Sequence, residues 1–204
     1  MSKKKRSKEV ENDSQVEHID NSPRVHQKEK LKWQLSIRER NDYTETQKKI
    51  LEQSLDKNTR CVMIDGLWGT GKTSLCVLSA LKLLNMGKVD QLLYIRMPIE
   101  ASSNSKVGFL SGSLDEKMLP YAAPMWDKLE EFLPANEIQA LIKEKRVECI
   151  PAGFLQGRSF NCKAIIVDEA ASMSWEDLML IIRRGGEFTR IYFIGDTLNQ
   201  VYLS

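Results

Sequence analysis

Apolar residues gather in short runs along this chain, and stretches with helical spacing separate the runs. The runs lie at residues 61–65, 91–96, 147–150, 163–169 and 190–196. Runs that are apolar on both faces predict strands buried in a parallel sheet. The stretches with helical spacing lie at residues 44–55, 72–86, 114–119, 122–132, 136–145 and 175–184. Strands that alternate with helices predict an α/β fold, with a mostly parallel sheet and helices on both of its faces.

A different pattern precedes the first helix. Leu31, Trp33, Leu35 and Ile37 alternate with polar residues. A period of two is typical of a half-buried strand, so we expect a short edge strand at the start of one ordered domain over residues 31–204. Residues 1–30 are polar, with few apolar residues and no sustained period. Such a segment cannot bury enough apolar surface to offset its ordering entropy, so a disordered basic tail is predicted.

The segment between the first strand and the helix at residues 72–86 carries the strongest chemical signal. It reads Gly66, Leu67, Trp68, Gly69, Thr70, Gly71, Lys72 and Thr73, followed by Ser74. A glycine, four variable positions and Gly-Lys-Ser/Thr form a phosphate-binding loop, whose backbone N–H groups surround a triphosphate. Lys72 would contact the β- and γ-phosphates, and Thr73 would bind Mg²⁺. The alternative is a turn that only joins two elements, but the flanking strand and helix favour a nucleotide site.

Two carboxylates end the fourth apolar run. Asp168 and Glu169 follow a buried β-branched stretch, where negative charge is costly unless a cation lies close. In a phosphate-loop protein that cation is Mg²⁺, so Asp168 is predicted to bind the metal and Glu169 to polarise the attacking water. An acidic strand end that only caps the next helix is the alternative. Gln200 lies just beyond the last run and is the candidate sensor of the γ-phosphate.

Composition narrows the class of protein. The chain has 204 residues, 42% of them hydrophobic, which allows one globular domain and a tail. Without a membrane-length apolar run or a signal peptide, we expect a soluble cytoplasmic protein with no membrane partner. Its four cysteines lack the paired spacing of a zinc site or disulfide framework and are expected to be isolated thiols in apolar surroundings. The basic residues at positions 3–8 form either a solubilising tail or a contact for nucleic acid phosphates.

Several segments together resemble a known family. The loop at residues 66–73, the Asp168-Glu169 strand end and the Gly195-Asp196 segment with Gln200 resemble the first RecA-like domain of superfamily 1 helicases. The stretches at residues 96–101, 107–117, 119–124 and 153–161 resemble the middle of PhoH-like proteins. The resemblance covers about residues 41–202. It implies a RecA-like P-loop NTPase fold in a cytoplasmic, ATP-binding protein of bacteria or phages, associated with ATP hydrolysis and RNA-related work and using ATP and Mg²⁺.

The resemblance adds one residue and reveals two departures. In helicase-like ATPases a glutamine upstream of the loop contacts adenine, which gives that role to Gln47; Thr44 and Gln47 also fit a capping box, and the sequence leaves both interpretations open. Leu67 and Trp68 stand where the family usually has Pro-Ala, at positions that the loop motif leaves free. The family usually continues well beyond the Gly-Asp segment, so we expect the domain over residues 31–204 to be incomplete at its C-terminus.

Three functions fit these observations. The first is Mg-dependent ATP hydrolysis coupled to RNA or single-stranded nucleic acid, with Lys72, Glu169 and Gln200 as catalytic residues. Because no second RecA-like domain fits in 204 residues, any arginine finger would come from another protomer, and we expect a homo-oligomer. The second is an ATP-binding interaction module with little or no turnover. The third is a P-loop kinase, but the Asp168-Glu169 pair fits water activation better.

Overall fold

The computed structural model describes residues 29–96, 114–151, 155 and 157–196, with the backbone alone at residues 114–121. Its centre is a five-stranded sheet in which every pairing is parallel, in the order β1-β5-β4-β2-β3. The strands are β1 (Cys61–Asp65), β2 (Gln91–Arg96), β3 (Val147–Pro151), β4 (Lys163–Asp168) and β5 (Arg190–Gly195). All five carboxyl ends therefore meet at one edge of the sheet, and the predicted α/β architecture is confirmed.

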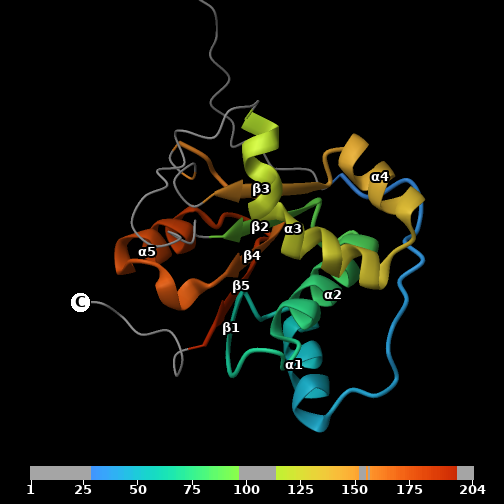
Figure 1. The fold of residues 1–204 in the computed structure, drawn as a ribbon, viewed down its shortest axis with the longest axis horizontal. Helices are drawn as coiled ribbons and strands as arrows, with labels where there is room; N and C mark the ends of the chain where they lie inside the picture. Colours follow the sequence, from blue (N-terminus) through green and yellow to red (C-terminus); the bar gives the residue numbers. More distant parts are fainter. Residues whose placement is uncertain (1–28, 97–113, 152–154, 156, 197–204) are drawn as a thin grey trace, which may run out of the picture.

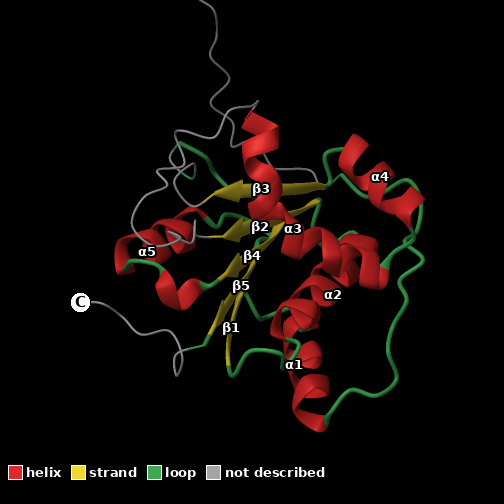
Figure 2. Cartoon of the chain, in the orientation of Figure 1, coloured by secondary structure: helices red, strands yellow, loops and turns green. Residues whose placement is uncertain are grey.

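Helices cover both faces of this sheet, as Figures 1 and 2 show. One face carries α1 (Glu45–Leu55), α2 (Lys72–Asn85), α3 (Leu114–Phe132) and α4 (Ala135–Lys143). The other carries α5 (Trp175–Arg184) and the short 3-10 helix η3 (Ala170–Ser172). Two apolar clusters, one on each side of the sheet, fill the space between the layers. The central strands are apolar on both faces because both faces are covered.

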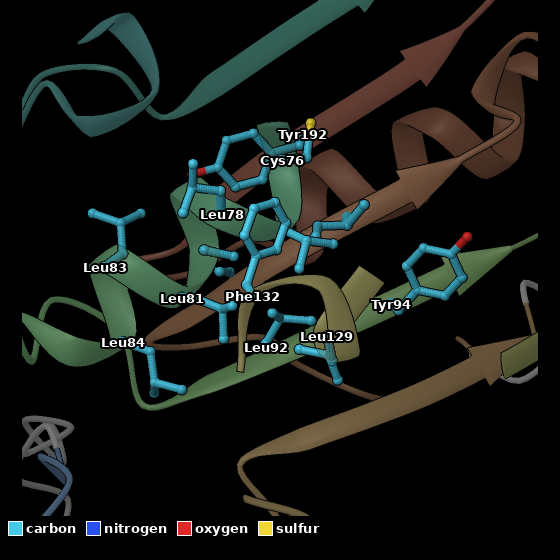
Figure 3. Close-up of a cluster of buried hydrophobic side chains, with 14 of the residues drawn as sticks. Cys76, Leu78, Leu81, Leu83, Leu84, Leu92, Tyr94, Leu129, Phe132 and Tyr192 are labelled. Carbon is cyan, nitrogen blue, oxygen red and sulfur yellow. The ribbon is translucent and has the colours of Figure 1, made fainter. Parts of the chain in front are cut away.

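The larger cluster lies between the sheet and α2 (Figure 3). Leu78 and Leu81 of α2, Leu92 of β2 and Leu129 of α3 are fully buried in it. Burying one such leucine side chain contributes about 1.5–3 kcal/mol relative to leaving it exposed. This packing fixes α2, and with it the loop that precedes α2, against the carboxyl edge of the sheet.

The predicted edge strand at residues 31–37 is wrong. This segment runs as irregular chain, and Leu35 is buried while Leu31, Trp33 and Ile37 pack against the larger cluster. Its backbone N–H groups bond to side chains instead of a neighbouring strand: Leu35 donates to Asn85 Oδ1 at 2.8 Å and Ser36 to Glu137 Oε2 at 2.9 Å. The alternation therefore comes from an irregular segment that packs its apolar side against the core and bonds to α2 and α4.

Other boundaries agree closely with the predictions. α5 spans the predicted residues, and α2 ends where Gly87, at a left-handed φ of 62°, stops it. Two helices were expected at residues 114–119 and 122–132, but α3 is one helix with Pro124 in its interior. Proline removes a helical hydrogen bond and bends a helix, and α3 changes direction near its middle (Figure 1).

The structure also bears on two expectations from composition, one about the cysteines and one about membrane-spanning helices. All four cysteines lie in the described residues and none forms a disulfide. Cys76 and Cys162 are buried, whereas Cys61 lies on the exposed face of β1, contrary to the apolar surroundings expected for all four. Within the described residues, every helix falls short of the length and apolar character needed to cross a membrane. The predictions for residues 1–28 lie outside the described part of the chain.

Candidate nucleotide-binding site

The glycine loop leaves the carboxyl end of β1 and leads directly into α2. Gly69 and Gly71 have φ values of 75° and 82°, which side chains with a Cβ rarely adopt. Gly71 is the N-cap of α2, and no side chain caps this helix end. The loop therefore turns the unpaired N–H groups of the first helical turn toward the carboxyl edge, as an anion-binding helix N-terminus requires.

The Lys72 side chain folds back from the end of the loop to its beginning. Its amino group donates to the carbonyl of Gly66 and, at 2.7 Å, to that of Leu67. The hydroxyl of Thr70 also donates to the Leu67 carbonyl, at 2.8 Å, which adds a second bond within the loop. A lysine ammonium has three donors, so the two bonds to carbonyls leave one for a phosphate oxygen.

A cavity of about 440 Å³ lies at the carboxyl edge of the sheet, beside the loop. Its walls come from four elements: the loop with the start of α2, the end of β4, the end of β5 and one residue of α3. They are Trp68, Gly69, Thr70, Gly71, Lys72, Thr73, Ser74, Lys128, Asp168, Glu169, Ile194, Gly195 and Asp196. Because β5 lies between β1 and β4, the strand order brings the loop, Asp196 and the two carboxylates around one space.

Asp168 is held firmly at the base of this cavity. Only 8% of its surface is exposed. The Tyr94 hydroxyl donates to its Oδ2 atom, and the Glu169 backbone N–H donates to its Oδ1 atom at 3.2 Å. Burial, followed by the negative charge of Asp168, raises the pKa of Tyr94 far above its ordinary value. The hydroxyl therefore stays protonated and remains a donor to the carboxylate.

Glu169 occupies an unusual backbone conformation. Its φ of 57° and ψ of 34° are left-handed, which is uncommon for any residue with a Cβ. Its side chain is one-third exposed and lies 3.6 Å from the Arg96 guanidinium, between Oε1 and Nη2. Asp168 is the last residue of β4 and is buried, whereas Glu169 begins the turn after β4 and is more exposed. Both carboxylates line the cavity.

A helix that the sequence did not connect with the site supplies a second lysine. Lys128 of α3 lines the cavity and forms an ion pair with Glu131, 3.1 Å between Nζ and Oε2. Ser74, directly after Thr73, donates to the same Glu131 oxygen at 3.2 Å. α3 therefore adds positive charge to the cavity wall and is tied to the first turn of α2.

Gln47 forms the predicted capping box and also contacts the glycine loop, while its contact with adenine stays a prediction. Its Oε1 accepts from Thr44 N at 3.0 Å, and its N–H donates to Thr44 Oγ1 at 3.3 Å, so the capping box is formed. The Nε2 atom of the same side chain donates to the Thr70 carbonyl at 3.1 Å. Capping and contact with the glycine loop are thus compatible, since they use different atoms of one side chain.

The structure places most of the predicted site residues together. The cavity is lined by the loop from Trp68 to Ser74 and by both carboxylates, while Gly66 and Leu67 take part through their carbonyls, which accept from Lys72. Gln200 lies outside the described residues. Tyr94, Lys128 and Glu131 were missed. The only signal for Tyr94 was a polar hydroxyl within an apolar strand, and that signal does not identify its partner.

A larger cavity of about 660 Å³ lies at the opposite, amino end of the sheet. Its lining includes Arg60, Lys88, Phe188 and Arg190, and it contains none of the predicted site residues. In open parallel sheets, ligands bind outside the carboxyl ends of the strands. The smaller cavity, with its convergent lysines and carboxylates, is therefore the candidate site.

The residues around the smaller cavity fit a magnesium ion better than a transition metal. Within the described residues, no cluster of three or more His, Cys, Asp or Glu side chains could hold a metal ion. Mg²⁺ is usually bound by one or two protein ligands, and phosphate oxygens and water complete its shell. A hydroxyl from Thr73 and a carboxylate from Asp168, which both line the cavity, provide that kind of partial ligand set.

A parallel sheet with this strand order, a glycine loop that opens a helix and an acidic strand end beside it define a P-loop NTPase. The family model described as "PhoH-like protein" matches residues 39–203. The chain belongs to this family, and the resemblance found in the sequence is confirmed.

Curated relatives agree with the family match. A PhoH-like protein of Synechocystis sp. is 33% identical over 63% of this chain and 38% of its own length. A PhoH-like protein of Bacillus subtilis is 31% identical over 63% of this chain and 40% of its own length. One of Mycobacterium tuberculosis is 32% identical over 70% of this chain and 40% of its own length. The chain thus spans about 40% of the relatives it matches. Among solved structures, an arterivirus nonstructural protein 10 (helicase) complex with DNA has a TM-score of 0.34 and 18% identity, over 76% of this chain and 32% of that one.

Proposed function

We propose that this protein hydrolyses ATP in a Mg²⁺-dependent reaction coupled to RNA or single-stranded nucleic acid. One observation carries the proposal: Lys72 and Thr73 share a cavity with Asp168 and Glu169 at the carboxyl ends of β1 and β4. Charge stabilisation and water activation, the two requirements of phosphoryl transfer to water, thus have candidate groups in one space. The coupling to nucleic acid is supported by the family resemblance and the basic residues at positions 3–8.

Each residue has a defined task in this proposal. The N–H groups from Gly69 to Thr73 and the Lys72 ammonium hold the phosphates and neutralise the charge that develops on them. Thr73 and Asp168 would hold the metal, and a bound Mg²⁺ would supply positive charge that offsets the charge of the phosphates. Glu169 accepts a proton from the attacking water and orients it toward the γ-phosphate. Gln200 remains the candidate sensor on the segment after β5.

The proposal also includes contacts between protomers. The described part of the cavity lining contains two lysines and no arginine. An arginine that stabilises the transferred phosphoryl group typically accelerates hydrolysis about 10³–10⁵-fold, so a second copy of the chain is the proposed source. Association of copies would then make the hydrolysis rate per protomer depend on protein concentration.

Gln47 is proposed to contact adenine as well as to cap α1. Gln47→Ala should lower the preference for ATP over GTP about threefold to tenfold, the equivalent of one hydrogen bond. Fluorescence titration of both nucleotides measures this ratio. Thr44→Ala is the matched control, because it removes the cap at a cost of about 1 kcal/mol in stability without touching the loop. An unchanged ATP-to-GTP ratio in Gln47→Ala would leave Gln47 with the cap and the Thr70 contact and would contradict the adenine role.

Steady-state ATP hydrolysis, measured with and without single-stranded RNA over a range of protein concentrations, tests the proposed function. We expect Mg²⁺-dependent turnover that RNA stimulates, at a rate per protomer that increases with protein concentration. Turnover that does not change with RNA would restrict the proposal to an ATPase. A constant rate per protomer from a chain that sediments as a monomer with ATP and Mg²⁺ would exclude the arginine in trans. Nucleotide binding without any turnover would instead identify an ATP-binding interaction module.

A further inference from the structure

The Tyr94 hydroxyl reaches Asp168 from the neighbouring strand. Tyr94 pairs with Ile166 across β2 and β4, two residues before Asp168, which pairs with Arg96. Its ring belongs to the larger apolar cluster and only 1% of its surface is exposed (Figure 3). The hydroxyl donates to Asp168 Oδ2. The hydroxyl of a buried core residue thus binds a carboxylate that lines the cavity.

We propose that Tyr94 is a positioning residue that orients the Asp168 carboxylate for Mg²⁺; this inference rests on the proposed function. The terminal torsion of an aspartate is broad, so a carboxylate held at one atom can rotate. Here Tyr94 holds Oδ2 and the Glu169 N–H holds Oδ1, and the two bonds together fix the carboxylate plane. They occupy two of about four lone-pair sites, and the others remain for the metal or its water.

The position of Tyr94 makes this role specific. Its hydroxyl cannot reach bulk solvent from the core, and Asp168 is the partner that satisfies it. Removal of the hydroxyl would leave Oδ2 without its donor and would release the carboxylate to rotate. Loss of groups that orient metal ligands typically lowers metal affinity about 10–100-fold. The affinity for nucleotide in the absence of metal depends on the loop and Lys72, and it should not change.

A second buried tyrosine provides a matched control. Tyr192 of β5 is fully buried in the same apolar cluster. Among the described residues, its hydroxyl has no hydrogen-bond partner. Tyr192→Phe therefore removes the same atom from the same core without removing a contact to the site. Because phenylalanine keeps the ring that packs in the core, both variants should fold, and thermal melting of each verifies this.

The experiment titrates Mg²⁺ against a fluorescent ATP analogue bound to the full chain, with a parallel series in EDTA. For Tyr94→Phe we expect half-saturation to move to about 10-fold higher Mg²⁺ or more, with unchanged nucleotide affinity in EDTA. Tyr192→Phe should match the wild type throughout. If Tyr94→Phe matches the wild type, or both variants shift equally, the positioning role is overturned while the proposed function stands. If the wild type itself binds nucleotide without regard to Mg²⁺, both proposals fail.

Discussion

Lys72→Ala should abolish measurable ATP hydrolysis, with a loss of at least about 10²–10³-fold in turnover. Removal of one preorganised donor from the developing charge of a transition state has an effect of this size. Nucleotide affinity should also fall, by about 10- to 100-fold, because a charged hydrogen bond to a phosphate contributes about 1.5–3 kcal/mol. Steady-state hydrolysis and fluorescence titration measure the two effects separately.

Lys82→Ala is a suitable control for Lys72→Ala. Lys82 lies on the same helix, where it pairs with Glu39 at 2.7 Å, and it does not line the cavity. It should retain wild-type turnover and affinity. Hydrolysis by Lys72→Ala within twofold of the wild type would contradict the assignment of the glycine loop as the phosphate site.

Glu169→Gln should separate binding from turnover. Glutamine has the same size and can still orient water, but it cannot accept the proton, so turnover should fall about 10²–10⁴-fold. ATP affinity should stay within a few-fold of wild type, because Glu169 is not among the groups assigned to the phosphates. A single-turnover assay and a nucleotide titration on the same preparation measure both quantities.

Glu176→Gln provides the comparison for Glu169→Gln. Glu176 lies exposed in the first turn of α5, outside the cavity lining, and its neutralisation should leave turnover unchanged. If Glu169→Gln hydrolyses ATP as fast as Glu176→Gln, the base lies elsewhere. Asp196, at the end of β5 in the same cavity, would then be the next residue to replace.

Local patterns in the sequence were sufficient to predict the glycine loop. The loop is continuous in the chain, and its chemistry depends on the order of its own residues, from Gly66 to Thr73. The Asp168-Glu169 strand end could be predicted for the same reason. Their meeting in one cavity followed from a general property of parallel sheets, whose carboxyl ends share one edge.

The contacts that the sequence missed join residues that lie far apart along the chain. Tyr94 meets Asp168 only because β2 is the neighbour of β4, and an apolar run does not specify its neighbours. The wrong strand at residues 31–37 has a related cause. Its alternation was interpreted as half of a ladder, but the groups that satisfy its backbone are the side chains of Asn85 and Glu137.

At Glu169 the left-handed backbone lowers the stability of the fold, while the side chain supplies a carboxylate to the cavity. A residue with a Cβ in this conformation typically costs about 1–2 kcal/mol, and glycine would adopt it without that strain. Glycine, however, would remove the carboxylate from the cavity. Selection for heat resistance alone would therefore favour Glu169→Gly, although this substitution removes the proposed catalytic carboxylate. The strained turn after β4 thus indicates where an engineer should not look for added thermostability.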